Sequence, residues 1–221
     1  MRKEEIEIPI NHFAVGANLV IPENVRALVI FSHGSGSSRF SPRNNYIADV
    51  LNKHGIATLL ADLLTRQGDM NYDNRFNISL LSKRLVMVTG WAIQRKELMD
   101  LPVGYFGAST GAASALNAAV LLKDQITAVV SRGGRPDLAR DVLPQVWAAT
   151  LLIVGSLDTP VIQLNQLAYD ILVCKKHMRI IQGASHLFEE SGKLEEVARL
   201  ALNWFMENLV QPQIIKQKEI H

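Results

Sequence analysis

The chain has 221 residues, of which 48% are hydrophobic and 20% charged, a balance typical of globular proteins and not of disordered chains. Its 23 basic and 21 acidic residues leave a net charge of only +2, which argues against nucleic-acid or membrane partners. A single cysteine, Cys174, excludes a disulfide framework. The first ten residues lack the apolar stretch of a secretory signal, so we expect a cytoplasmic protein.

Short apolar runs recur along the chain and predict eight β-strands, the later ones buried on both faces of a sheet. The first two runs precede any helical pattern, which predicts an antiparallel pair at one sheet edge. In chain order, the predicted strands are Glu5–Ile10, Ala14–Ile21, Ala27–Ser32, Ile56–Ala61, Val103–Phe106, Ala128–Ser131, Leu151–Val154 and Arg179–Ile181.

Apolar stripes at helical spacing separate the later strands. They run from Tyr46 to Leu51, Ile78 to Ala92, Thr110 to Leu122, Val161 to Cys174 and Leu194 to Phe205. The alternation predicts a single α/β domain over residues 1–221, with a mostly parallel eight-stranded sheet, helices on both faces and little or no lid. The polar residues from about 210 to 221 are expected to fray.

The stretch from Val103 to Leu122 carries no charge and is long enough to span a bilayer. Its glycines, serines and asparagine favour a buried strand that leads into a buried helix instead. We therefore expect no membrane association.

A candidate nucleophile lies between that strand and that helix. Gly107-Ala108-Ser109-Thr110-Gly111 is a G-x-S-x-G pattern, and its strand–turn–helix setting is that of a nucleophile elbow. The glycines let two backbone segments approach closely while the serine takes a strained turn. The alternative is a glycine-bounded turn whose serine caps the helix. The setting favours Ser109 as the nucleophile.

A serine nucleophile needs a base and an acid that orients the base, and in this kind of fold the chain order is Ser, Asp or Glu, then His. Asp158 follows the predicted strand Leu151–Val154, and His186 follows Arg179–Ile181. Each alone could be an ordinary loop residue. Because each directly follows its own strand and the order is right, we predict the triad Ser109, His186 and Asp158. Asp62 is a rival acid that precedes the serine and breaks this order.

An acyl-transfer site also needs donors for the developing oxyanion. The backbone N–H of Thr110, directly after Ser109, is the first predicted donor. The loop His33-Gly34-Ser35-Gly36 predicts the second, most simply the backbone N–H of Ser35. A phosphate-binding glycine loop is the competing interpretation, but the Gly-Lys-Ser/Thr ending is missing and Arg39 replaces a third glycine. His33 is expected to hold this loop by hydrogen bonds.

No histidine pair has metal-binding spacing, so neither a metal nor a cofactor is predicted. Cys174 is expected to be a packing residue. Arg39 and Arg132 follow strand ends on the predicted Ser109 rim, and arginine suits carboxylate or phosphate binding. They are candidates for holding an anionic substrate group. The alternative, left open here, is that the rim arginines pair with nearby aspartates and brace the loops.

These motifs resemble the α/β-hydrolase superfamily and its dienelactone-hydrolase-like branch. Two segments, Ser131-Arg132-Gly133-Gly134-Arg135 and Gly183-Ala184-Ser185-His186-Leu187, resemble most closely a small hydrolase domain that often occurs fused to a phosphoribosyltransferase. The resemblance implies the α/β-hydrolase fold over about residues 5–209. Dienelactone hydrolases carry cysteine where this chain has Ser109, so their lactone substrate is not implied. No phosphoribosyltransferase domain is recognised in these 221 residues.

The expected function is hydrolysis of a small carboxylic ester through an acyl-enzyme, and an anionic ester is expected if the rim arginines bind substrate. A ligand-binding or regulatory module without turnover is the alternative, because this superfamily includes inactive members. Transfer of the acyl group to an acceptor other than water, the natural substrate and the oligomeric state are left open.

Overall fold

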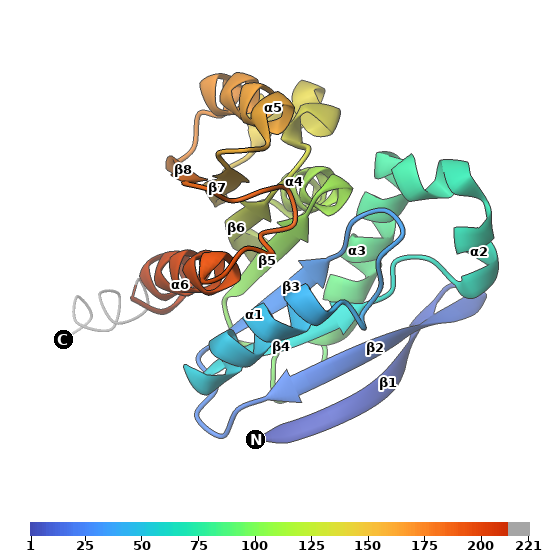
Figure 1. Ribbon diagram of the computed structural model, residues 1–221. Helices are drawn as coiled ribbons and strands as arrows, with labels where there is room; N and C mark the ends of the chain where they lie inside the picture. Colours follow the sequence, from blue (N-terminus) through green and yellow to red (C-terminus); the bar gives the residue numbers. More distant parts are fainter. Residues whose placement is uncertain (212–221) are drawn as a thin grey trace.

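In the computed structural model, which describes residues 1–211, the predicted strands form one eight-stranded sheet in the order β1-β2-β4-β3-β5-β6-β7-β8 (Figure 1). β1 is antiparallel to β2, and β2 to β4; all pairs from β4 onward across the sheet are parallel. The mostly parallel sheet with an antiparallel edge is therefore confirmed. The strands are β1 (Arg2–Ile10), β2 (Phe13–Ile21), β3 (Ala27–Ser32), β4 (Ile56–Ala61), β5 (Val103–Ala108), β6 (Ile126–Arg132), β7 (Ala149–Gly155) and β8 (Lys176–Ile181).

The two edge strands begin earlier than their apolar residues indicate. β1 begins at Arg2 and β8 at Lys176, where the sequence predicts starts at Glu5 and Arg179. Much of each edge strand is exposed to solvent. Charged side chains are therefore compatible with pairing there, and an apolar run marks only part of the strand.

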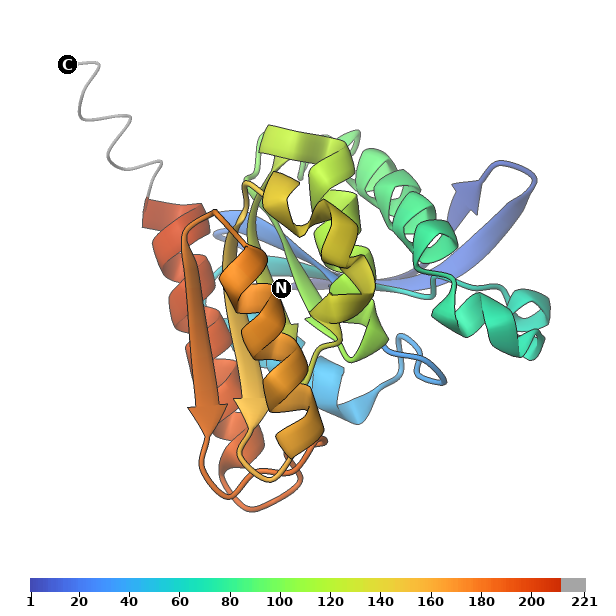
Figure 2. The same ribbon diagram turned by 90° about the horizontal axis from the view of Figure 1, so that it is seen from above.

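Helices cover both faces of the sheet, as predicted (Figures 1 and 2). α1 and α6 pack together on one face, and α3, α4 and α5 belong to the core on the other. The α-helices are α1 (Pro42–Lys53), α2 (Arg66–Met70), α3 (Ile78–Ile93), α4 (Thr110–Leu122), α5 (Thr159–Ile171) and α6 (Lys193–Phe205). Shorter turns are the 3₁₀ helices η1 (Tyr72–Phe76), η2 (Lys123–Gln125) and η3 (Pro136–Gln145) and the π-helical turn η4 (Met206–Val210). Most of the predicted polar tail lies outside the described residues.

The uncharged segment divides into β5 and α4, both largely buried. Within residues 1–211, no helix is long and apolar enough to cross a membrane. At the centre of the sheet, Phe31 of β3 and Phe106 of β5 stack with ring centroids 4.9 Å apart. Packing of this kind holds the two strands whose following loops contain Ser35 and Ser109.

The connections between elements leave the site without a large lid. The β6–β7 connection contains η3, which packs against α4 and α5 and stays on their side of the sheet. Between β4 and α3, α2 and η1 form a small projection that the sequence analysis did not predict (Figure 2). The side chains of Thr65 and Asn71 cap α2 and η1, and that of Asn77 caps the following helix α3, so the projection depends on local capping and not on an apolar stripe.

Candidate active site

Ser109 occupies a strained turn between β5 and α4. Its φ of 51° and ψ of −124° lie in a region rarely adopted by residues other than glycine, and its side chain does not cap the helix. The flanking glycines are needed for close packing. A Cβ on Gly107 would lie 2.5 Å from Ala112 Cα, and one on Gly111 would lie 2.1 Å from the carbonyl oxygen of Ser32. The G-x-S-x-G pattern therefore forms the tight turn that its spacing predicts.

Asp158 and His186 come together from the ends of β7 and β8. His186 Nδ1 donates a hydrogen bond of 2.6 Å to Asp158 Oδ2. Asp158 is the N-cap residue of α5, but its carboxylate does not cap the helix. This carboxylate, whose side chain is only 13% exposed, is therefore placed to fix the orientation of the imidazole. A proton on Nδ1 leaves Nε2 free to accept another proton.

The loop that carries His186 is anchored on both sides of the histidine. Ser185 donates its backbone N–H to Glu190 Oε1 at 3.0 Å, and this bond holds the pKa of Glu190 below its ordinary value. Phe188 is fully buried and has a φ of 58°. The buried ring of Phe188 and the hydrogen bond from Ser185 to Glu190 thus hold the loop that positions His186.

Ser109 and His186 line the same cavity, of about 140 Å³, together with Gly34, Ser35 and Arg132. Among the described residues, the ring of His186 is hydrogen-bonded to Asp158 and not to Ser109. Such contacts are often long in the absence of substrate. The volume lies below the usual range for sites that take drug-sized ligands, so the cavity suits a small molecule.

The loop after β3 lies against the elbow. Gly34 is so close that a Cβ there would be 3.0 Å from Ser109 Cβ. The backbone N–H of Ser35 donates to the Thr110 hydroxyl at 2.9 Å. The backbone N–H of Thr110 belongs to the first residue of α4, where N–H groups have no partner within the helix. Both predicted oxyanion donors thus lie at the elbow, with that of Ser35 engaged by Thr110.

His33 holds this loop, as the sequence analysis expected. Its Nδ1 lies 3.0 Å from the carbonyl oxygen of Gly34, and its Nε2 accepts the backbone N–H of Leu63 at 3.3 Å. These contacts imply a proton on Nδ1. With both ring nitrogens engaged, His33 links the loop after β3 to the segment after β4.

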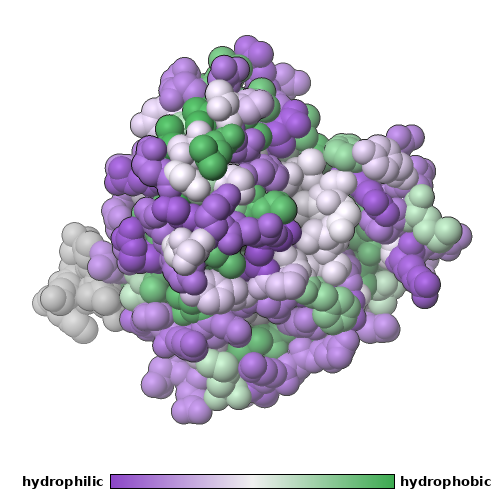
Figure 3. Space-filling view, in the orientation of Figure 1, coloured by the Kyte–Doolittle hydropathy of each residue, from purple (hydrophilic) through white to green (hydrophobic). Residues whose placement is uncertain are grey.

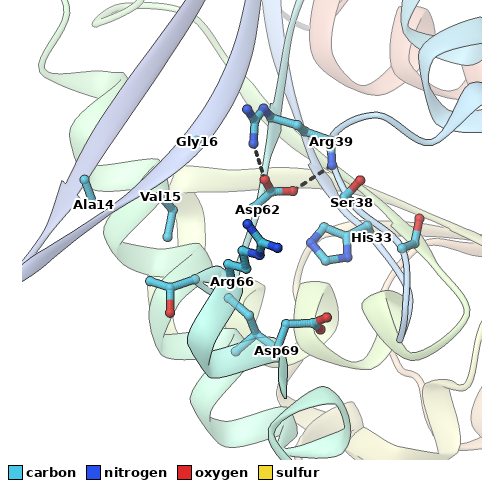
Figure 4. A pocket seen from close by; sticks show the side chains of 12 residues that line it. Ala14, Val15, Gly16, His33, Ser38, Arg39, Asp62, Arg66 and Asp69 are labelled. Carbon is cyan, nitrogen blue, oxygen red and sulfur yellow. Dashed lines mark hydrogen bonds and ion pairs between the residues drawn. The ribbon is translucent and has the colours of Figure 1, made fainter. Parts of the chain in front are cut away.

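Arg39 lies in a different pocket from Ser109 (Figure 4). This pocket, of about 290 Å³, is lined by residues of β2, the loop after β3 and the start of α2. The guanidinium of Arg39 pairs with Asp62 and, at 3.1 Å, with Glu5, and its backbone N–H donates to Asp62 Oδ1 at 2.8 Å. Its geometry fits the loop-bracing alternative. Asp62, the rival candidate for the triad acid, is engaged in this ion pair with Arg39.

Arg132 is the predicted arginine that lines the Ser109 cavity. Arg43, at the start of α1, lines it too and pairs with Glu189 through Nη1 at 2.7 Å. Arg43 was not among the residues predicted from the sequence. Its position in the first turn of a helix that directly follows the oxyanion loop was the available signal, but nothing in the local sequence indicates that its side chain reaches Ser109.

Within the described part of the chain, no three His, Cys, Asp or Glu side chains gather as metal ligands would. Cys174 lies after α5, which ends at Ile171 and not at Cys174 as predicted. Its partly buried thiol contacts the Thr150 hydroxyl at 3.7 Å, and burial raises the pKa of the thiol. These features fit a packing residue.

No protein-family model matches the chain. A crystal structure of a dienelactone hydrolase from Anabaena variabilis is 49% identical, has a TM-score of 0.91, and matches over 94% of this chain and 98% of its own. Est1E from Butyrivibrio proteoclasticus is only 16% identical but has a TM-score of 0.76 over 92% of this chain and 98% of its own. This second likeness supports the fold alone.

Two Mycobacterium tuberculosis proteins, named provisionally as phosphoribosyl transferases, are 51% identical to the chain over 212 residues. The match covers 96% of this chain and 48% of each relative. The chain therefore spans about half the length of the curated relatives it matches.

Proposed function

Because this chain belongs to the dienelactone hydrolase family, we propose that it is a serine hydrolase that cleaves a small carboxylic ester or a related acyl bond. Ser109 is the nucleophile, His186 the base and Asp158 the group that orients the base. The observation that carries the proposal is the 2.6 Å hydrogen bond from His186 Nδ1 to Asp158, on a histidine that shares a cavity with the strained Ser109.

In the first half-reaction, Ser109 Oγ attacks the ester carbonyl while His186 Nε2 takes its proton. The tetrahedral intermediate then breaks its bond to the alcohol oxygen, which receives that proton from His186. Water attacks the acyl-enzyme in the second half-reaction, again giving a proton to Nε2, and the acid leaves as Ser109 recovers its hydrogen. Asp158 stabilises the imidazolium in both halves.

The oxyanion is stabilised by two backbone N–H groups, one at the start of α4 and one in the loop after β3. The N–H of Thr110 points from a helix N-terminus, whose partial positive charge favours a negative oxygen. The N–H of Ser35 becomes the second donor when it leaves the Thr110 hydroxyl, a change that requires only rotation of the Thr110 side chain. Thr110→Ala keeps the backbone donor and removes this competitor. We expect Thr110→Ala to retain hydrolysis in steady-state assays.

The size of the site supports a small substrate. The Ser109 cavity has a volume of about 140 Å³, and no residue of η3, which packs against α4 and α5, lines it. Figure 3 shows a largely hydrophilic face on which hydrophobic residues are scattered in small groups. A long acyl chain would find little apolar surface on that face.

The phosphoribosyl transferase name of the longer relatives belongs, in this proposal, to the half of those proteins that lies outside the match. This chain, which matches the other half, carries the serine elbow and the Asp158–His186 pair. The lactone substrate implied by the family name is not transferred either, since the nucleophile position holds serine.

Labelling with a fluorophosphonate, followed by mass spectrometry of the modified peptide, tests the proposal. We expect modification at Ser109 and none in Ser109→Ala or His186→Ala. Ser37→Ala is the matched control, because it removes another hydroxyl that lines the same cavity. Ser109→Ala should lower turnover of an activated aryl ester by about 10⁶-fold. A folded protein with neither labelling nor turnover across an ester panel would instead support the ligand-binding module.

A further inference from the structure

Arg132 lies on the strand next to the one that leads into Ser109. It is the last residue of β6 and lies opposite Ala108 of β5. Its carbonyl oxygen accepts the backbone N–H of Ser109 at 3.2 Å. The side chain lines the cavity that Ser109 and His186 share. A group bound by the Arg132 guanidinium would therefore lie only a few bonds from a carbonyl carbon attacked by Ser109.

Two of the three guanidinium nitrogens of Arg132 are buried without a protein partner among residues 1–211. The residue is 7% exposed, and the two nitrogens are Nε and Nη1. Burying a charge in this way is costly unless something pairs with it. Arg39, Arg75 and Arg135, by contrast, each form an ion pair with an aspartate. The arrangement at Arg132 thus leaves a cation in need of an anion inside the cavity.

A second cation lines the same cavity. Arg43 contributes from the first turn of α1, and within the described part of the chain its Nε is likewise buried without a partner. Its other contact, to Glu189, involves a carboxylate whose side chain is 63% exposed. Burial, with a smaller effect of the nearby Arg43 charge, lowers the pKa of Arg132 to about 10, so Arg132 stays charged at neutral pH.

We propose that Arg132 and Arg43 bind an anionic oxygen group of the substrate, a carboxylate or a phosphate, a few bonds from the scissile carbonyl. The planar guanidinium of Arg132 offers paired N–H donors that match such a group. The inference rests on the proposed ester hydrolysis for its chemistry, but the anion site stands on the two arginines alone. It narrows the substrate class to small esters with a second, negatively charged end.

Matched esters test this. Monoethyl glutarate carries a carboxylate and ethyl 4-phosphonobutanoate carries a phosphonate; ethyl pentanoate is the neutral counterpart of similar length. Acid release is followed by titration at constant pH. We expect kcat/KM to be at least about tenfold higher for one or both anionic esters. The better anionic ester identifies the carboxylate or the phosphate type. Equal values for all three esters would overturn the proposal.

Arginine variants locate the effect. Arg132→Met should lower the ratio of anionic to neutral kcat/KM by about 10- to 100-fold, and Arg43→Gln should lower it by a smaller factor. Arg135→Gln is the matched control, since Arg135 pairs with Asp137 and does not line the cavity, and its ratio should equal that of the wild type. An Arg132→Met protein that loses activity equally on both kinds of ester would contradict substrate binding.

Thermal melting with glutarate separates this inference from the proposed function and detects variants that fail to fold. Glutarate should raise the melting temperature of the wild type and of Ser109→Ala, but not that of Arg132→Met. If no ester is cleaved but this shift occurs, the anion site is supported and the hydrolase proposal fails. If Ser109 is labelled but glutarate shifts nothing, the anion site fails and the hydrolase proposal stands. If Arg132→Met does not fold, Arg43→Gln tests the anion site instead, through the ratio of anionic to neutral kcat/KM and the melting shift with glutarate.

Discussion

Replacing Ser109 with glycine should abolish hydrolysis and at the same time stabilise the fold. The φ of 51° and ψ of −124° at Ser109 are strained for any residue with a Cβ, whereas glycine adopts them readily. The hydroxyl does not cap α4, so its removal costs little native bonding. The conformation of Ser109 thus suits its role as nucleophile but lowers the stability of the fold.

The size of the effect follows from two opposing contributions. Relief of backbone strain contributes about 1–3 kcal/mol to the free energy of unfolding. The greater freedom of glycine in the unfolded chain costs about 0.5–1 kcal/mol. The difference is about 0–2.5 kcal/mol, a net stabilisation of about 1 kcal/mol at the middle of the range. For a chain of this length, a stabilisation of about 1 kcal/mol raises the melting temperature by roughly 2–4 °C.

Ser109→Ala is the reference for this measurement, because it removes the hydroxyl but keeps the Cβ and the strain. Thermal and urea unfolding of the two variants should place Ser109→Gly above Ser109→Ala, with both inactive. Ser37→Gly controls for the general effect of glycine: Ser37 has no positive φ, so its stability should stay the same or fall. If Ser109→Gly is no more stable than Ser109→Ala, the turn stores no strain and this reasoning is refuted.

Three further outcomes are expected. Asp158→Asn should lower kcat on an activated aryl ester by about 10⁴-fold, because an amide would donate to His186 Nδ1 and leave the proton on Nε2; a loss below tenfold would exclude the orienting role. Arg39→Ala should lower the free energy of unfolding in urea by about 2–3 kcal/mol, since it breaks a largely buried pair with Asp62. It should also slow anionic and neutral esters equally, and a selective loss on the anionic ester would instead make Arg39 a substrate contact. Rates on aryl esters should fall from short to long acyl chains, and a maximum at about ten or more carbons would contradict the small, uncovered cavity.

The sequence by itself determined the order of strands along the chain and the turns that follow them. Buried parallel strands must be apolar on both faces, so continuous apolar runs mark them clearly, and β3 and β4 match their predicted bounds. The positions of Ser109, Asp158 and His186 followed from the same logic, since parallel strands bring their carboxyl ends to one edge of the sheet. Edge strands obey no such rule, and β8 was recognised only over its last three residues.

Only the tertiary structure decided which partner each polar group meets. Arg39 and Arg132 both follow predicted strand ends and are equivalent in the sequence. In the structure, Arg39 pairs with Asp62 and Glu5, whereas two buried nitrogens of Arg132 have no partner among residues 1–211. Arg43 enters the Ser109 cavity from a helix 66 residues earlier in the chain. Apolar periodicity is a local property and survives in the sequence. The pairing of charges depends on side chains from distant segments, whose approach is set by how the helices and loops pack on the sheet.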